Sequence, residues 1–217
     1  VISRVLEAEG LRVAVLAQPD WHDAEAFRAM GRPRLGVFIG AGNLDSMVAH
    51  YTAAKRRRSE DFYSPGKRTG CRPDRAAIVY CNRAREAFGP DVPIILGSLE
   101  ASLRRFAHYD YWDDSVRRAI LFDAPADLLV YGMGEAATIE IAHRLKKKQS
   151  VHTMTDIPGT GYITRDPSVC KFDHITLPSF EDVRDDKRLY AEATRTEYAE
   201  HDPVRGRAMI QPCEGRY

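Results

Sequence analysis

The chain has 217 residues and a mass of 24.5 kDa, enough for one hydrophobic core and at most a small appendage. Its 44% hydrophobic and 29% charged residues are typical of soluble globular proteins and exclude disordered, fibrous and disulfide-dense classes. A net charge of +1 creates no overall field toward nucleic acid or anionic lipid, and the longest apolar runs are too short to span a bilayer. We therefore expect no membrane partner.

The four cysteines, Cys71, Cys81, Cys170 and Cys213, are widely and irregularly spaced. Structural zinc and iron-sulfur sites use ligands only a few residues apart, so the sequence predicts no metal site. The low cysteine content and the lack of an apolar leader favour reduced thiols in a cytoplasmic protein.

Apolar runs bounded by turn residues predict four strands. They are expected at residues 11–18, 35–40, 92–97 and 127–132. The last three are short and mainly apolar, as in strands that are buried on both faces.

Helices are expected between these strands. Apolar spacing indicates them before Gly10, at residues 44–51 and after Gly134, and the polar stretch at residues 20–30 is compatible with a helix. Asp74 can cap a further helix that Gly89 ends. Two short helices are expected within residues 97–121. Strands that alternate with helices predict an open, mostly parallel α/β sheet covered on both faces.

The pattern changes after residue 150, which divides the chain into an α/β domain at 1–150 and a C-terminal part at 151–217. Residues 157–163 indicate a turn and short strand, forming a hairpin at the sheet edge. Residues 181–198 predict a charged helix with too few apolar positions to stand alone, so it must dock on another element.

The glycine turns after two of the strands have two explanations each. Gly132-x-Gly134-x-x-Ala137 fits a dinucleotide fingerprint formally, with Asp156 further on, but that fingerprint belongs to a first βα unit. We favour small residues that let a helix start close to the sheet. At residues 40–43 we favour a tight turn capped by Asn43 over a phosphate site.

Residues 55–75 contain eight basic and three acidic residues and read as a long loop. A solvated loop is the ordinary interpretation, and a phosphate or RNA site is the alternative. Residues 100–118 contain paired arginines, a histidine, four aromatic residues and three aspartates, directly after a buried strand. Ligands bind beyond the carboxyl ends of parallel strands, so this segment is either a ligand or domain interface or a self-paired surface.

Asp20-Trp21-His22 contains the Asp-x-His core of cobalamin-ligating loops, but Glu25 occupies the position at which such loops have glycine. We therefore discount cobalt ligation by His22.

Several strings together resemble one family. Residues 17–21, 41–47, 72–76 and 100–118 are similar to the N-terminal region of YgiQ-type radical SAM proteins. The resemblance runs from about residue 6 to residue 145 and resumes at 177–190. It implies an accessory domain that precedes the catalytic core, in which a cysteine triplet holds a 4Fe-4S cluster that cleaves S-adenosylmethionine. That triplet is absent from these residues, so the resemblance implies no cofactor in this fragment.

Related radical SAM enzymes carry a cobalamin-binding-type accessory domain, so the resemblance implies a flavodoxin-like sheet. The first strand of that order lies centrally, and its residues would precede Val1. The partner would be the catalytic core of the same polypeptide, and the substrate is unknown. We expect Arg104, Arg105, His108, Tyr109, Tyr111 and Trp112 to line or border a cleft. The full set of candidate cleft residues is Asn43, Asp45, Glu100, Arg104, Arg105, His108, Tyr109, Tyr111, Trp112 and Glu135.

Three hypotheses follow. The first is an accessory domain that shapes the substrate side of a radical SAM active site without chemistry of its own. The second is an RNA-binding module that uses the basic loop at 55–75 and the aromatic residues at 109–112. The third is a cobalamin-binding domain, which the incomplete Asp-x-His loop weakens.

Overall fold

An open four-stranded sheet forms the centre of the computed structural model, which describes residues 1–202 and 204–217. Its strands run in the order β1 (Val37–Ile39), β2 (Ile94–Leu96), β5 (Leu128–Val130) and β6 (Thr160–Gly161). The first three are parallel, whereas β6 pairs antiparallel with β5 at one edge. The mostly parallel sheet is therefore confirmed, and three of its strands lie within predicted segments.

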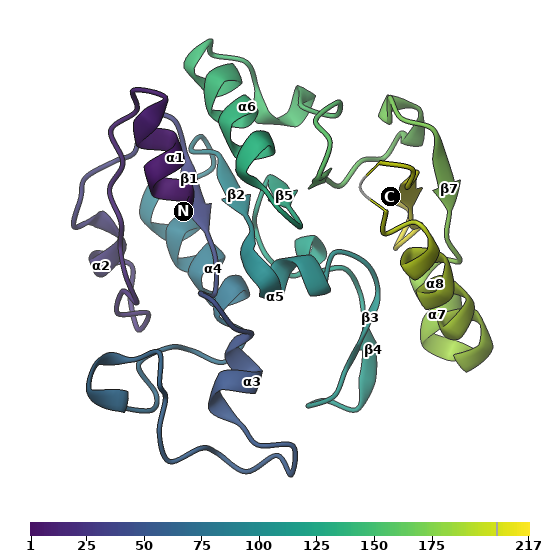
Figure 1. The fold of residues 1–217 in the computed structure, drawn as a ribbon, viewed down its shortest axis with the longest axis horizontal. Helices are drawn as coiled ribbons and strands as arrows, with labels where there is room; N and C mark the ends of the chain where they lie inside the picture. The colour runs from purple at the N-terminus through teal and green to yellow at the C-terminus, as the bar shows by residue number, and fades with distance from the viewer. Residues whose placement is uncertain (203) are drawn as a thin grey trace.

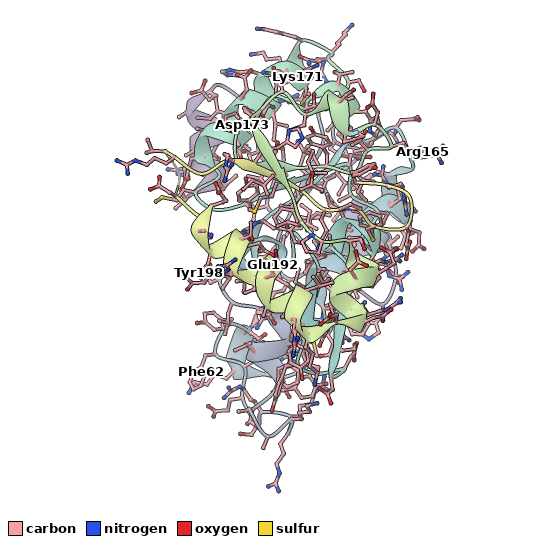
Figure 2. The ribbon with its side chains drawn as sticks, turned by 90° about the vertical axis from the view of Figure 1, so that its right-hand side faces the viewer. Phe62, Arg165, Lys171, Asp173, Glu192 and Tyr198 are labelled. Atoms are coloured by element: carbon pink, nitrogen blue, oxygen red, sulfur yellow. The ribbon has the colours of Figure 1, made fainter. Side chains whose placement is uncertain are left out.

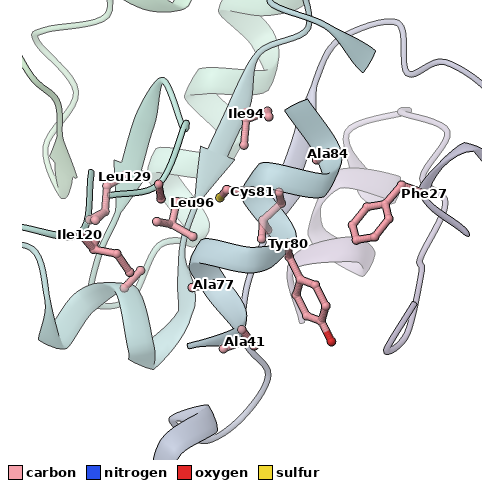
Figure 3. Close-up of a cluster of buried hydrophobic side chains, with 14 of the residues drawn as sticks. Phe27, Ala41, Ala77, Tyr80, Cys81, Ala84, Ile94, Leu96, Ile120 and Leu129 are labelled. Atoms are coloured by element: carbon pink, nitrogen blue, oxygen red, sulfur yellow. The ribbon is translucent and has the colours of Figure 1, made fainter. Parts of the chain in front are cut away.

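Helices cover both faces of this sheet (Figure 1), because alternate residues of each strand point to opposite sides. Ile94 and Leu96 face α4 (Ala76–Phe88), and Figure 3 shows them beside Cys81. Ile95, between them, packs in a second cluster that includes α6 (Glu135–Lys146). Every residue of β2 and β5 is buried, which explains their unbroken apolar sequences.

Two short helices near the N-terminus extend these layers. α1 (Ile2–Ala8) packs against α6, and α2 (Glu25–Arg28) packs against α4. Phe27 of α2 contributes its ring to the cluster under α4, next to the ring of Tyr80 (Figure 3).

The strand predicted at residues 11–18 is wrong: these residues have no regular structure, and Val15 is 63% exposed. A strand requires a neighbour that accepts and donates its backbone hydrogen bonds. Among the described residues no strand pairs with this segment, although the outer edge of β1 is unpaired. The β-branched composition alone therefore did not produce a strand.

Two predicted helix caps are also wrong. Arg75, in the left-handed region with φ of 51°, precedes α4, and the Asp74 carboxylate instead accepts hydrogen bonds from the side chains of His50 and Tyr51. α3 (Ser46–His50) is capped by Asp45, whose Oδ1 accepts from two backbone amides of the first turn. The exposed Asn43 lies outside that cap.

The basic loop between α3 and α4 is irregular apart from the 3-10 turn η1 (Pro65–Lys67). A buried ion pair anchors it: Nη2 of Arg72 lies 2.8 Å from Oδ2 of Asp61, and both side chains are at most 3% exposed. Arg72 also donates to the carbonyl oxygen of Ala41, directly after β1. The loop is thus attached to the carboxyl edge of the sheet.

The segment after β2 contains one helix, α5 (Ser98–Leu103), and then a hairpin of β3 (His108–Asp110) and β4 (Ser115–Arg117). The 3-10 turn η2 (Ile120–Phe122) follows. The second short helix predicted here is therefore a hairpin, because Asp110 turns the chain by accepting hydrogen bonds from the amides of Trp112 and Asp113.

The C-terminal part packs on this hairpin. Figure 1 shows α7 (Phe180–Asp185) and α8 (Lys187–Ala199) beside β3 and β4. Phe180, Val183 and Ala193 share a buried cluster with Ala107 and Val116. The predicted docking of this helical segment on another element is therefore observed.

Some details of the C-terminal part differ from the prediction. The single helix is broken at Asp186, whose extended backbone and carboxylate cap the start of α8. The short strand β6 does lie at the sheet edge, but it pairs with β5 and forms no local hairpin. The remaining elements are two 3-10 turns and a parallel strand pair: η3 (Val151–Thr153), η4 (Pro167–Val169), β7 (His174–Thr176) and β8 (Ala208–Ile210).

Figure 2 views the molecule from the side of α8, with Glu192 and Tyr198 on its outer surface and Phe62 on the basic loop. Tyr198 is 84% exposed. Within the described residues, no helix combines the length and apolar character needed to cross a bilayer.

Candidate functional site

A pocket of about 490 Å³ lies between α3, the start of the basic loop, the end of α5 and the β3–β4 hairpin. It contains six of the ten candidate residues: Asp45, Arg104, His108, Tyr109, Tyr111 and Trp112. Its volume falls within the range of small-molecule sites. α3 and α5 follow β1 and β2, so the pocket lies toward the carboxyl side of the parallel strands.

Asp45 and Arg104 join the two helices that border the pocket. The Nη1 group of Arg104, at the end of α5, donates to Oδ2 of the buried Asp45, which also caps α3. Arg104 donates in addition to the backbone oxygen of Glu100. The guanidinium charge is therefore neutralised by a carboxylate, and its first task is to hold α3 against α5.

His108 lies on the hairpin side of the pocket as a neutral imidazole. Burial lowers the pKa of His108 to about 4, and the hydrogen bond to the Phe106 carbonyl oxygen only partly opposes this effect. Nδ1 lies 3.1 Å from that oxygen. A carbonyl can only accept, so Nδ1 carries the proton and Nε2 is left as an acceptor.

Aromatic rings form the outer wall. Trp112 lies 5.2 Å from Tyr51 and 5.3 Å from Tyr111 between ring centroids. The hydroxyl of Tyr111 donates to the Ala53 carbonyl oxygen, and Nζ of Lys55 donates to the Trp112 carbonyl oxygen. These contacts tie the basic loop to the hairpin and close the wall.

Arg58 supplies the other positive charge of the pocket lining. Its Nε donates to the carbonyl oxygens of Val48 and Tyr51 at 3.1 and 3.0 Å, which fixes the guanidinium at the end of α3. Across residues 1–202 and 204–217, Arg58 has no carboxylate within ion-pair distance. Sequence reasoning counted Arg58 only as part of the basic loop.

Four candidate residues lie outside the pocket lining. Glu100 is 1% exposed and accepts hydrogen bonds from the amides of Ser46 and Ala77, so it stabilises the starts of α3 and α4. Asn43 is exposed, and Glu135 lies in the first turn of α6. The expected cleft therefore does not gather these residues.

Arg105, the fourth, points toward α8. Its Nη2 lies 3.5 Å from Oε2 of Glu197, and its guanidinium stacks over the ring of Tyr131 at 5.3 Å. Burial raises the pKa of Glu197, although the charge of Arg105 opposes that effect. Arg105 thus fastens the C-terminal helix to the α/β domain.

The pocket includes residues that the sequence did not single out, above all Tyr51, Arg58 and Asp110. Asp110 is buried and pairs with Arg75, the residue that precedes α4, at 3.0 Å. Burial raises its pKa, but hydrogen bonds from Arg75 and the backbone more than offset this, so the net pKa is lowered. In the sequence, the one signal for a structural role of Asp110 was the preference of aspartate for turns.

The glycine turn after β5 lets helix α6 start close to the sheet, as we favoured from the sequence, and does not form a dinucleotide site. A Cβ on Gly134 would lie 2.5 Å from Cγ1 of Val130, so only glycine lets α6 begin this close to the strand. Asp156 pairs instead with Arg144 of α6.

The cysteines do not fit an iron-sulfur cluster. All four are free, and the described residues contain no group of three or more His, Cys, Asp or Glu side chains that could hold a metal ion. Burial raises the pKa of Cys81 to about 12 and that of Cys213 to about 11, which opposes the thiolate form that binds iron.

Asp20 and His22 form a local hydrogen bond between Oδ1 and Nδ1 at 2.6 Å, and the imidazole stacks on Trp21. Both side chains are about two-thirds exposed, at 67% and 70%. They precede α2 and do not line the pocket.

The comparisons with known proteins agree with the resemblance found in the sequence. The profile of the family described as Radical SAM N-terminal matches residues 1–217. A UPF0313 protein of Clostridium botulinum strain 657 and one of Clostridium perfringens strain SM101 are each 52% identical over 217 residues. The whole chain is covered, but it spans only 34% and 33% of these relatives, about a third of their length. No solved structure matches the chain.

The family match covers every residue, and it includes the segments that build the pocket wall. The resemblance to the N-terminal region of YgiQ-type radical SAM proteins is thereby confirmed. The chain belongs to the Radical SAM N-terminal family.

Proposed function

We propose that this chain is the accessory domain of a radical SAM enzyme and that its pocket forms part of the substrate side of the active site. The catalytic core, with its 4Fe-4S cluster and S-adenosylmethionine, would belong to the remaining two-thirds of the polypeptide. The observation that carries the proposal is the pocket of about 490 Å³ between α3, the basic loop and the hairpin. This chain would supply binding groups and no radical chemistry.

The rim of the pocket supports a docking role for the same side of the domain. Leu103, at the end of α5, is 60% exposed, and Val48 of α3 is 44% exposed, although both are large apolar residues. Met133, after β5, is 94% exposed. Apolar side chains exposed at the carboxyl side of the parallel strands are consistent with a surface that the catalytic core covers.

Photo-cross-linking in the full-length protein tests this orientation. A photoreactive phenylalanine analogue at Leu103 should cross-link to peptides that follow Tyr217. The matched control carries the analogue at Tyr198, which is more exposed but lies on the outer surface of α8 (Figure 2). Equal yields at the two positions, or cross-links only at Tyr198, would contradict the proposal.

We also propose that the sheet is flavodoxin-like and that a strand preceding Val1 completes it beside β1. The support is the parallel order of β1, β2 and β5, together with an outer edge of β1 that has no partner among the described residues. The backbone amide of Val37 donates to the Pro93 carbonyl oxygen, on the β2 side of the strand. Successive amides of a strand point in opposite directions, so the amide of Phe38 points toward the unpaired edge of β1. In the full-length protein that amide should exchange slowly with deuterium, and rapid exchange would refute the added strand.

The cobalamin-binding alternative rests on Asp20 and His22. Their hydrogen bond engages Nδ1 and leaves Nε2 of the exposed imidazole uncommitted. If the chain is an accessory domain that binds no cobalamin, the absorption spectrum of added hydroxocobalamin should be the same with the full-length protein and with its His22→Ala variant. A spectral shift that His22→Ala abolishes would favour the alternative.

RNA binding is a second candidate function, favoured by cations that lie on exposed aromatic rings. Nζ of Lys55 lies 4.9 Å from the ring centroid of Tyr111, and Nζ of Lys67 lies 4.9 Å from that of Phe62. Such pairs suit a phosphate backbone with stacked bases. This reading predicts RNA affinity that falls steeply with salt and decreases in Phe62→Ala; affinity that is insensitive to both would exclude it.

A further inference from the structure

We propose that the pocket binds a planar aromatic molecule carrying one anionic group, a phosphate or a carboxylate, which Arg58 recognises. The inference rests on the proposed function for placing this ligand at the substrate side of the enzyme. It names the chemical class of the ligand, which neither the family nor its relatives specify.

The charges of the pocket lining favour an anion. Asp45 is neutralised by Arg104, and Asp110 is neutralised by Arg75. Arg58 is the remaining charged residue of the lining, and in the described parts of the chain no carboxylate pairs with it. The charged lining residues sum to zero, but Arg58 is the one among them whose charge has no oppositely charged partner in the described residues.

The position of Arg58 suits a fork-shaped contact with an anion. Its Nε is engaged by two backbone carbonyl oxygens, at 3.1 Å and 3.0 Å, which immobilises the guanidinium plane. Its terminal amino groups form no hydrogen bond within residues 1–202 and 204–217. A guanidinium that is already oriented loses less side-chain freedom when it binds a phosphate or carboxylate.

The wall of the pocket favours a flat ring. Tyr51, Tyr109, Tyr111 and Trp112 all contribute to the lining. Tyr109 and Tyr111 are 48% and 46% exposed, so their rings are accessible to a ligand. Stacking on such rings stabilises a bound planar group whatever the exact chemistry of its ring.

His108 adds a directional acceptor. Its Nδ1–H is used by the Phe106 carbonyl oxygen, so Nε2 can accept a hydrogen bond from an N–H or O–H of the ligand. The volume of about 490 Å³ accommodates one ring system with its anionic group. Size and charge together favour a small molecule over a polynucleotide in this pocket.

Calorimetric titration of the full-length protein tests the proposal, because binding requires neither the cluster nor turnover. Adenosine 5′-monophosphate, adenosine, 4-hydroxybenzoate and inorganic phosphate are titrated separately at pH 7. We expect one-to-one binding of the nucleotide or the aromatic carboxylate, at least tenfold tighter than binding of adenosine or phosphate. The preferred anion identifies whether the ligand carries a phosphate or a carboxylate.

Two pairs of variants locate the binding. Arg58→Gln should weaken it at least tenfold, whereas Arg56→Gln, in the same exposed loop but outside the lining, should leave it unchanged. Tyr109→Ala, on the hairpin, should weaken it at least fivefold, whereas Phe62→Ala, which removes an exposed ring of the basic loop outside the lining, should not. Circular dichroism spectra matching the parent exclude unfolding as the cause.

Three results would overturn the proposal. They are absence of saturable binding by both aromatic anions, equal losses in Arg58→Gln and Arg56→Gln, and tighter binding of an RNA oligomer with a steep salt dependence. The cross-linking of Leu103 to the catalytic core is measured independently. If Leu103 cross-links to the catalytic core but neither aromatic anion binds, only the proposed ligand class is refuted. If an aromatic anion binds but Leu103 does not cross-link, the proposed accessory role is refuted.

Discussion

Replacing Arg72 with methionine should release the basic loop that forms one wall of the pocket. Arg72 and Asp61 are 3% and 1% exposed, and the guanidinium reaches both carboxylate oxygens of Asp61 at 2.9 and 2.8 Å. Removing one partner of a buried ion pair leaves the other charge uncompensated, which costs about 3–5 kcal/mol. Arg72→Met also loses the hydrogen bond to Ala41 after β1.

Hydrogen exchange of peptides that cover residues 61–75 measures this loss locally, without unfolding the rest of the protein. Each 1.4 kcal/mol corresponds to a tenfold change, so exchange should accelerate by roughly two to four orders of magnitude. Arg68→Met, at an exposed position of the same loop, is the matched control and should change exchange little. Similar exchange in the two variants would refute the anchoring role of the pair.

The same ion pair predicts a dependence on pH. Burial raises the pKa of Asp61, but hydrogen bonds from Ser64 and Arg72 outweigh that effect and hold the net pKa below its usual value. A carboxyl with a lowered folded-state pKa stabilises the fold above its unfolded pKa, which is about 3.9. The loop should therefore lose protection as the pH falls below about 4, and Asp61→Asn should lack this acid-dependent step.

Two further predictions concern stability. Gly134→Ala should raise the free energy of the folded state by about 1–3 kcal/mol, because the added Cβ would lie 2.5 Å from Cγ1 of Val130. The control is Gly97→Ala, whose Cβ would meet only an ordinary contact at 3.5 Å. Equal urea midpoints for the two variants would refute this reasoning. His108 has a pKa lowered from 6.5 to about 4, so the unfolded chain binds the proton first and stability should decline as the pH falls from about 6.5 toward 4. His108→Gln should reduce that decline in thermal unfolding, and an unchanged pH profile would contradict a buried neutral imidazole.

The sequence was sufficient for the buried centre of the fold. β2 and β5 are fully buried and have no polar residue, so their apolar runs were a direct signal of parallel strands. Residues 11–18 carried the same β-branched signal and were predicted wrongly, since no strand pairs with them among the described residues. Composition indicates the ability to form a strand, and the neighbour decides whether it forms.

The candidate site was predicted only in part, because its residues come from separate segments of the chain. The dense polar and aromatic segment after β2 indicated six candidate residues between Arg104 and Trp112, and the pocket gathers five of these six. Tyr51 and Arg58 come from a different part of the chain, and only the folding of the basic loop against the hairpin brings them to the same pocket. Arg105 could not be separated from Arg104 by sequence, because the direction of each depends on the distant Glu197 and Asp45.

The central proposal, that the pocket side of this domain faces the proposed catalytic core, is tested most directly by magnetic relaxation in the full-length protein, reconstituted with iron and sulfide and then reduced. A nitroxide amino acid is placed at Leu103, on the pocket rim, or at Tyr198, on the outer surface of α8. The account predicts that the cluster accelerates relaxation of the label at Leu103 and has little effect at Tyr198. Stronger acceleration at Tyr198, or none at either position, would contradict it.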